Sequence, residues 1–171
     1  GSQPIGNGIG PALEARDVLW LLRRDLRRPL DLEKKCIILA TETLKLANIK
    51  SPREKVLEIL NSGRAYNKMK EIIKAQQGKV FNPDKIKIGN FKYNVRSSRN
   101  GIVRKISNSI ISKIARIAGA PANKGAGIYL YKHVGNKIKK GEKLFTIYAE
   151  SRVKINFVKE ALKIGNGFVV K

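Results

Sequence analysis

Cysteine and histidine are nearly absent from the 171 residues, which contain only Cys36 and His133. A single cysteine excludes an intramolecular disulfide and a zinc site built on cysteine pairs, and it fits a reducing compartment. A single histidine excludes catalytic designs that need several. No apolar run approaches the roughly 18 residues of a membrane span, and no signal-peptide pattern occurs. We therefore expect a cytoplasmic protein without a membrane partner.

Acidic residues are also scarce: 13 Asp and Glu stand against 36 Lys and Arg, which gives a net charge of +23. The excess is concentrated after Asp84, since residues 85–171 hold 20 basic and 3 acidic residues. Such a basic segment favours nucleic acid as a partner, because Lys and Arg neutralise phosphates. The alternative is a lysine-rich, solvent-exposed surface of the kind found in many thermophile proteins. No RNA-binding or zinc-finger pattern decides between the two.

Methionine occurs once, as Met69, and the sequence begins Gly1-Ser2. Because translation starts at methionine, we expect the chain to be a piece of a longer parent, produced by cloning or by cleavage. The remaining composition is that of a folded protein, since 42% of the residues are hydrophobic and can form a core.

Helical periodicity dominates the first half. Pro11 suits the first position of a helix, and apolar residues then recur at spacings of three and four up to Leu22. Asp31 is expected to cap a second helix that ends near Ala47. The apolar stripes of the helices, with Cys36 among them, are predicted to be core.

A third and a fourth helix carry the clearest boundary signals. Ser51-Pro52-Arg53-Glu54 predicts a capping box with proline at the first helical position. Gly63 is expected to end the third helix in a left-handed conformation. The fourth carries an apolar stripe over residues 66–73 and is expected to end at Gly78.

Alternating patterns replace helical ones after the turn cluster at residues 81–84. Asn100-Gly101 predicts a tight turn between two strands. One helix is expected in this half, capped by Asn108 or Ser109 and ended at Gly119, while residues 158–162 fit either a helix or a strand. Strands are predicted at residues 86–88, 93–95, 102–106, 127–131, 134–138, 144–148 and 167–170.

This change of period predicts an α+β fold. We assign residues 1–80 to a helical segment, residues 81–92 to a linker and residues 93–171 to a small β-rich domain.

Two glycine-rich stretches have some features of a phosphate cradle. Residues 6–10 precede a predicted helix, whose N-terminus favours an anion, and residues 123–127 combine glycines with a lysine. Neither has the spacing of a dinucleotide-binding or P-loop motif. The favoured interpretation is a turn in both places. The first would let helix and sheet pack closely, and the second would lead into a strand.

Other chemistry-bearing residues are isolated. Glu142 and Glu150 would need a common cleft for acid–base work, and nothing in the sequence brings them together, so local hydrogen bonding is favoured. His133 is interpreted as an exposed histidine at a strand end, and Cys36 as a small core residue. We assign no catalytic residue and no metal ligand, and we expect no cofactor.

Residues 134–142 read V-G-x-x-I-K-K-G-E, which resembles a strand–turn–strand segment of lipoyl- and biotinyl-type domains. Those domains carry their cofactor on an exposed hairpin lysine in a Met-Lys-Met-like or Asp-Lys-Ala-like context, and neither occurs here. The resemblance implies a barrel-sandwich or hammerhead-like fold without the carrier chemistry.

Three separated stretches resemble the thymidine phosphorylase family, and its archaeal branch of AMP phosphorylases most closely. They follow the family's order: GSQPIG (1–6) with GIGPALEARDVL (8–19), then AGAP (118–121) with KGAGI (124–128), and finally LFTIYAES (144–151). The resemblance implies the C-terminal part of such an enzyme, with helices from the parent's α/β core followed by the β-rich domain.

The implied parent reaction is phosphorolysis. Phosphate would attack the ribosyl C1′ of AMP and give adenine and ribose 1,5-bisphosphate, or thymidine would be cleaved in the same way. In the family, the phosphate-binding loops and catalytic residues lie upstream of the stretch resembling Ser2-Gln3-Pro4. This chain alone is therefore expected to be inactive, with a structural role in covering the core and supporting subunit assembly.

Ser2 and Gln3 are the residues expected nearest the substrate, because the resemblance places them after a sheet strand at its C-terminal end, where α/β sites gather. The implied partners are the missing N-terminal part of the enzyme, phosphate with AMP or a nucleoside, and further copies in an oligomer. A basic nucleic-acid-binding protein is the alternative. Residues 93–100 are more basic than the family pattern, which leaves an added role for this surface open.

Overall fold

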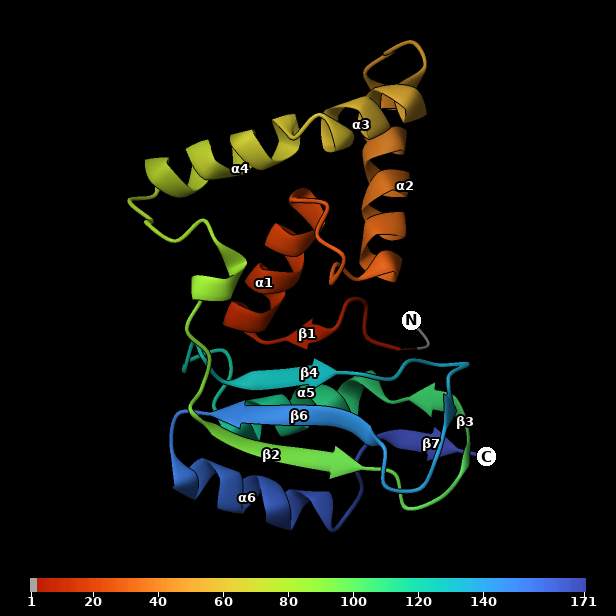
Figure 1. Cartoon of the computed structure of the whole chain (residues 1–171), viewed down its shortest axis with the longest axis vertical. Helices are drawn as coiled ribbons and strands as arrows, with labels where there is room; N and C mark the ends of the chain where they lie inside the picture. The colour runs from red at the N-terminus through yellow and green to blue at the C-terminus, as the bar shows by residue number, and fades with distance from the viewer. Residues whose placement is uncertain (1–2) are drawn as a thin grey trace. The chain divides into compact units, whose positions relative to one another are not determined.

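The protein, described over residues 3–171 by a computed structural model, divides into two compact units (Figure 1). Unit 1 comprises the residues up to Glu14 together with Lys87–Lys171, and unit 2 comprises Ala15–Ile86. The helices and strands confirm the α+β class. In chain order they are β1 (Gly8–Ile9), α1 (Pro11–Leu22), α2 (Leu30–Leu46), α3 (Pro52–Asn61), α4 (Arg64–Ala75), a 3₁₀ turn (Pro83–Lys85), β2 (Phe91–Arg96), β3 (Gly101–Ile106), α5 (Asn108–Ala118), β4 (Gly127–Leu130), β5 (Lys137–Ile138), β6 (Lys143–Ala149), α6 (Arg152–Leu162) and β7 (Phe168–Val170).

Unit 2 is helical, and local signals explain most of its boundaries. Pro52 begins α3, and Gly63 follows it with φ 77°, as predicted. The predicted capping box is wrong, because Ser51 has a left-handed backbone (φ 47°) and its side chain makes no capping hydrogen bond. Asp31 is not a cap either, since α2 begins one residue earlier, directly after the extended Pro29. None of the described helices is long and apolar enough to span a bilayer.

The buried core of unit 2 is small. Its buried hydrophobic side chains are Leu19, Trp20, Leu21 and Leu60. The apolar stripe of α2 was predicted to be core but is largely exposed, and so is Cys36 on the same helix. The physical reason is that α1, α3 and α4 do not pack tightly on that stripe but leave a cavity of about 470 Å³ beside Leu32, Cys36 and Thr43.

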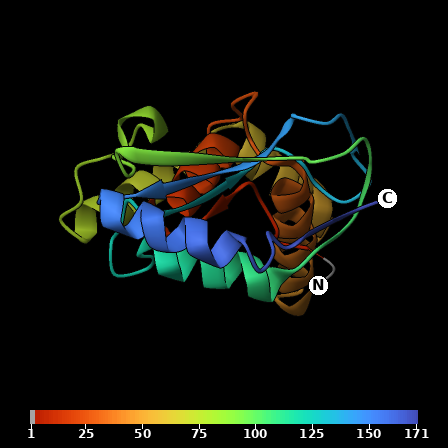
Figure 2. The same cartoon turned by 90° about the horizontal axis from the view of Figure 1, so that it is seen from below.

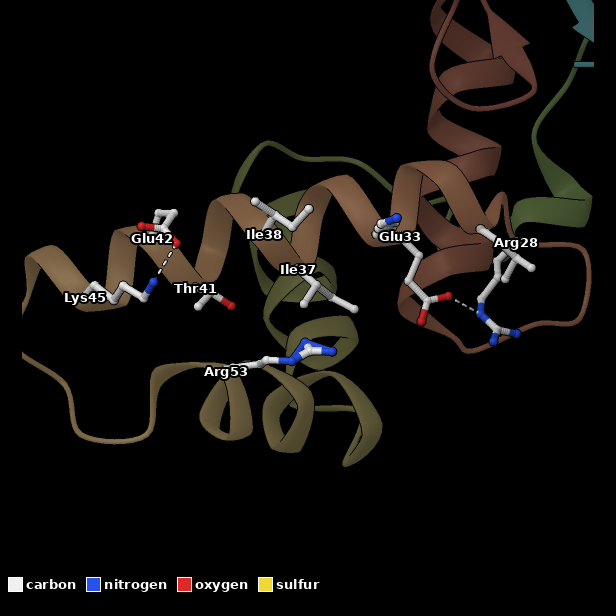
Figure 3. A pocket seen from close by; sticks show the side chains of 10 residues that line it. Arg28, Glu33, Ile37, Ile38, Thr41, Glu42, Lys45 and Arg53 are labelled. Carbon is white, nitrogen blue, oxygen red and sulfur yellow. Dashed lines mark hydrogen bonds and ion pairs between the residues drawn. The ribbon is translucent and has the colours of Figure 1, made fainter. Parts of the chain in front are cut away.

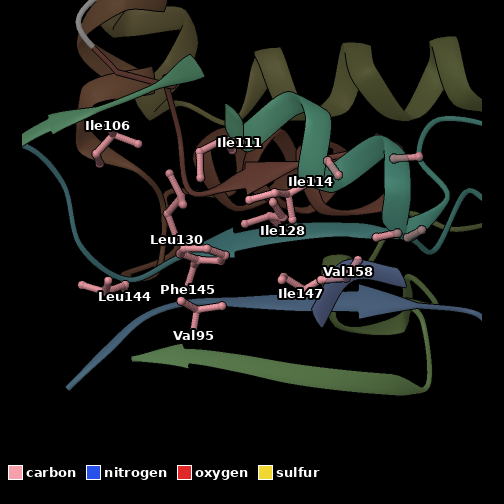
Figure 4. Packing of buried hydrophobic residues seen from close by; sticks show 14 of the residues in the cluster. Val95, Ile106, Ile111, Ile114, Ile128, Leu130, Leu144, Phe145, Ile147 and Val158 are labelled. Carbon is pink, nitrogen blue, oxygen red and sulfur yellow. The ribbon is translucent and has the colours of Figure 1, made fainter. Parts of the chain in front are cut away.

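Unit 1 is built on an antiparallel sheet in the order β1-β4-β6-β2. Helices α5 and α6 cover one face of it (Figure 2). Alternation along the strands sends Ile128, Phe145 and Ile147 toward these helices, where they pack against Ile114 and Val158 (Figure 4). The opposite face of the sheet carries polar and aromatic side chains.

A second, smaller sheet has the order β5-β3-β7. Because β3 pairs with β5 and β7 and not with β2, the predicted hairpin turn at Asn100-Gly101 is wrong. Gly101 instead permits a close approach of the chain end, since a Cβ there would lie 2.7 Å from the carbonyl oxygen of Lys171. A long-range backbone contact, not a tight turn, explains this glycine.

Three further expectations for unit 1 are corrected. Residues 86–88 form no strand, because no neighbouring strand provides a ladder for them. Ser107, not Asn108 or Ser109, caps α5 by accepting a hydrogen bond from the backbone N–H of Ile110. The β-rich half contains two helices where one was expected, because Ser151 caps α6 through the N–H of Lys154.

Residues before α1 belong to unit 1 because β1 pairs with β4, with Gly8 opposite Tyr129 and Ile9 opposite Ile128. The predicted division assigns these residues to the helical segment 1–80. That division into domains stays a prediction.

Candidate functional site

The candidate substrate-proximal segment is attached to the sheet of unit 1 by side-chain hydrogen bonds. The backbone N–H of Val134 donates to Oε1 of Gln3 at 2.7 Å. Asn7 donates from Nδ2 to Oη of Tyr129 at 3.3 Å, and its Oδ1 lies 2.8 Å from Nε2 of His133. We call these five residues the N-terminal latch. Ser2 lies outside the described residues, so its predicted role is not addressed.

His133 is therefore half-buried and bonded to the N-terminal segment, whereas it was expected to be exposed at a strand end. No local sequence pattern indicates this partner of His133, because Asn7 is 126 positions away. The only local signal was the position of Asn7 between two glycines, which marks a close approach of the backbone.

The glycine stretch 6–10 serves packing and does not form an open anion cradle. A Cβ on Gly10 would lie 2.5 Å from the carbonyl oxygen of Ala126, so only glycine permits this approach. The N–H of Gly10 donates to the carboxylate of Glu14 at 2.9 Å, and this donor is thus already used. The interpretation as a packing turn is confirmed.

The loop at residues 123–127 also holds a carboxylate of the protein. Glu150 accepts from the N–H of Gly125 at 2.9 Å and from Nδ2 of Asn123 at 3.0 Å. The loop continues directly into β4, which confirms the interpretation as a turn. An anionic ligand would have to displace Glu150 from these donors.

Glu142 acts locally as well. It accepts from the N–H of Lys139 at 2.9 Å and lies 3.2 Å from Nζ of Lys132. These two contacts, the backbone hydrogen bond first, hold the pKa of Glu142 below its usual value. The carboxylates of Glu142 and Glu150 thus have separate local partners and share no hydrogen-bonding group, as expected from the sequence.

Unit 2 contains a groove with a volume of about 580 Å³, formed by α2 and its neighbours (Figure 3). Figure 3 shows Arg53 reaching from α3 toward α2 beneath Ile37. Oγ1 of Thr41 is buried there without a hydrogen-bond partner among the described residues. The lining residues are Arg28, Leu30, Glu33, Lys34, Ile37, Ile38, Thr41, Glu42, Lys45 and Arg53.

Charges in this groove are mostly neutralised in pairs. Glu33 bonds to both Arg24 and Arg28, and Glu42 bonds to Lys45. Burial would raise the pKa of Glu33, but the hydrogen bonds from the two arginines outweigh it and the pKa is lowered. The groove has no nucleophile–base pair and no cluster of metal-ligating side chains is present in the described chain, so we assign it no catalytic role.

We expect Glu33→Gln to lower the free energy of unfolding at pH 7 by about 1.5–3 kcal/mol, the usual contribution of hydrogen bonds to a charged group. Because the pKa of Glu33 is lowered in the folded state, its contribution is present above the unfolded value and disappears as the pH falls through the folded value. Urea unfolding at pH 7 and pH 3 measures this. Glu42→Gln, whose ion pair with Lys45 is exposed, is the control and should change little. Equal effects of both variants would contradict the prediction.

Cys36 is a poor nucleophile in this setting. Although the residue counts as exposed, partial burial raises the pKa of its thiol, and the thiolate is the reactive form. Its exposure therefore does not make it a candidate for catalysis.

Comparison with known proteins shows which proteins this chain resembles. Residues 102–166 match the pyrimidine nucleoside phosphorylase C-terminal domain. The AMP phosphorylase of Thermofilum pendens is 41% identical over 162 residues, which cover 94% of this chain and 31% of the relative. The resemblance to the C-terminal part of an AMP phosphorylase is confirmed.

Two other relatives show the same partial coverage. The AMP phosphorylase of Pyrococcus furiosus is 45% identical over 161 residues, 91% of this chain and 32% of the relative. A putative thymidine phosphorylase of Albidiferax ferrireducens is 38% identical over 173 residues, 99% of this chain and 33% of the relative. The chain spans about a third of the length of the phosphorylases it matches.

Within this phosphorylase-like chain, the matched C-terminal domain contains α5, β4, β5, β6 and α6, together with all of β3 except Gly101. The N-terminal latch joins that domain to the segment carrying Gln3.

Proposed function

We propose that this chain is the C-terminal part of a cytoplasmic nucleotide phosphorylase and that its own role is structural. The complete enzyme would convert AMP and phosphate into adenine and ribose 1,5-bisphosphate, or would cleave thymidine in the corresponding reaction. Phosphate is a substrate in this proposal, and no cofactor is needed. The catalytic groups would come from the preceding part of the enzyme.

The observation that carries the structural role is the uncovered apolar face of unit 2. Leu46 is 87% exposed and Leu39 is 54% exposed, and their spacing of seven residues places both on the same face of α2. Covering one such side chain gains about 1.5–3 kcal/mol, so a helix with several of them is strongly favoured to bind a partner. The missing N-terminal part of the enzyme is the partner that the length of the relatives supports.

A cavity in the same unit also indicates a missing apolar partner. It has a volume of about 470 Å³ and is lined almost entirely by apolar side chains of α1 to α4. The lining includes Leu32 and Ile37 of α2 and Val56 and Ile59 of α3. In the proposed enzyme, apolar side chains of the preceding part would fill it and complete a core of normal size.

Gln3 is proposed to lie near the substrate of the complete enzyme. Its side chain is fixed by the N–H of Val134, so the C-terminal domain would hold this segment in place. The domain would thereby contribute to the geometry of the site without supplying a catalytic group. Assembly of the enzyme into an oligomer is a further part of the proposal.

A chimera tests the proposal. This chain replaces the matching 161 residues of the Pyrococcus furiosus AMP phosphorylase, and adenine release from AMP is measured with and without phosphate. We expect phosphate-dependent release from the chimera and none from the isolated chain. Comparable activity of the isolated chain would show that it contains the catalytic groups itself and would refute the structural role.

Single substitutions then test the proposed interface. Leu46→Asp leaves the isolated chain folded, because the side chain is exposed there, but we expect it to abolish activity of the chimera. Val153→Asp, at a 59% exposed position of α6, is the matched control and should leave activity unchanged. Equal activity of the two variants would mean that the face of α2 is not an interface.

A further inference from the structure

The sheet of unit 1 has one face that no helix of this unit covers (Figure 2). We call it the tyrosine face. It is defined by Lys92, Asn94, Tyr129, Tyr131, Thr146 and Tyr148, from three neighbouring strands and the residue after β4. Register places Tyr129 opposite Thr146, and Thr146 opposite Asn94, so the side chains form a row across the strands.

Hydrogen bonds hold this row in place. Oγ1 of Thr146 donates to Oδ1 of Asn94 at 2.7 Å and lies 3.1 Å from Oη of Tyr131. The rings of Tyr129 and Tyr131 pack edge to face with centroids 5.2 Å apart. The aromatic groups are thus preorganised on rigid strands, which lowers the entropic cost of binding a flat ligand.

The rings are accessible at two separate points. Tyr131 is 40% exposed, and Tyr148 is half-buried. The N–H of Tyr131 bonds to the carbonyl of Leu144, four residues before Tyr148 on β6, so the backbone positions of the two tyrosines lie about 13 Å apart along the strands. A chain of linked flat units is the kind of ligand that can contact both rings.

A lysine ammonium lies over each of these rings. Nζ of Lys143 is 5.2 Å from the ring centroid of Tyr131, and Nζ of Lys92 is 5.7 Å from that of Tyr148. A base that stacks on the ring would displace the lysine ammonium, which could then pair with a neighbouring phosphate of the same strand. Base stacking on an aromatic ring is worth more than an exposed cation–π contact, so the exchange is favourable.

The charge of unit 1 fits a polyanion. It holds 19 Lys and Arg against 4 Asp and Glu. Of the acidic residues near this face, Glu142 is paired with Lys132 at 3.2 Å, and Glu150 accepts hydrogen bonds from Gly125 and Asn123. Phosphates of a bound strand would therefore meet a predominantly basic surface.

We propose that the tyrosine face binds single-stranded nucleic acid. Unpaired bases stack on Tyr131 and Tyr148, while Lys92 and Lys143 neutralise adjacent phosphates. A single strand is required, because the bases of a duplex stack on one another and present no free face to a ring. The inference does not depend on the phosphorylase proposal, since it uses only side chains of unit 1.

Fluorescence anisotropy tests this with the 171-residue chain and a labelled oligouridylate of about 12 nucleotides, within the usual range of site sizes. We expect binding at physiological salt and weaker binding of a duplex of equal length. Tyr131→Ala and Tyr148→Ala should each weaken binding about tenfold. Phe157→Ala is the matched control and should leave the affinity unchanged. Phe157 is a 58% exposed aromatic residue of α6, the helix that packs on the other face of the sheet.

Two further variants separate stacking from charge and from folding. Lys92→Ala should make the plot of log K against log salt concentration less steep by about 0.7, the value for one phosphate contact on a single strand. Tyr131→Phe loses only the hydroxyl that contacts Thr146 and should bind like the unchanged chain. The proposal is overturned by an affinity no tighter than about 10⁻⁴ M, by alanine variants that bind like the original, or by a duplex that binds equally well.

Discussion

Phe145→Ala should remove about 3–5 kcal/mol from the free energy of unfolding of unit 1, a large part of the stability of a small domain. Phe145 has no exposed surface and packs in the cluster between the sheet and its two helices. Its ring also stacks on that of Phe168, with centroids 5.5 Å apart, so the substitution removes a contact between the two sheets as well. Truncation leaves a cavity that rigid strands on either side cannot close.

Urea denaturation followed by circular dichroism measures this loss. Phe157→Ala changes the same residue type at an exposed position and should shift the unfolding midpoint only slightly. A loss below about 1 kcal/mol at Phe145 would mean that the core can collapse around the gap.

Gly127→Ala should detach β1 from the sheet. A Cβ at this position would lie 2.1 Å from the carbonyl oxygen of Ile9, which is backbone and cannot rotate away. Restoring normal contact requires the N-terminal strand to move away from β4. We expect a cost of at least about 3 kcal/mol, at the upper end of the range for overpacked sites.

Amide hydrogen exchange locates the effect. The N–H of Leu130 donates to the carbonyl of Asn7 and should exchange much faster in the variant. The N–H of Tyr131, which donates to Leu144 inside the sheet, should stay protected. Gly165→Ala is the control, because Gly165 has the same φ of 159° but a Cβ there would meet no atom within 4 Å. Equal destabilisation by both variants would mean that the loss of stability comes from the positive φ that both glycines share, and not from the contact between the Cβ and Ile9.

Gly127→Ala should also lower the activity of the proposed enzyme. Releasing β1 would free the segment that carries Gln3, which Val134 and His133 otherwise help to hold in place. Activity of the chimera should then fall even though Gly127 itself contacts no substrate in the proposal. The expected change is a loss of rate with the C-terminal core still folded.

The sequence by itself determined the α+β class, the approximate positions of the helices and of six strands, and the resemblance to the phosphorylases. These features depend on local spacing and on contiguous motifs, such as Pro52 before an amphipathic stretch or the residues 144–151. Local rules also identified both glycine-rich loops as turns, because their spacing fits no phosphate motif.

Tertiary structure decided what depends on residues far apart in the chain. The pairing of β3 with β7 overrode the turn signal of Asn100-Gly101, since strand partners are chosen by burial of the whole sheet and not by one dipeptide. The bond between Asn7 and His133 joins positions 126 apart. The exposure of Cys36 depends on which element covers α2, and amphipathic spacing cannot name that element. The tyrosine face exists only because register places side chains of three strands in one row.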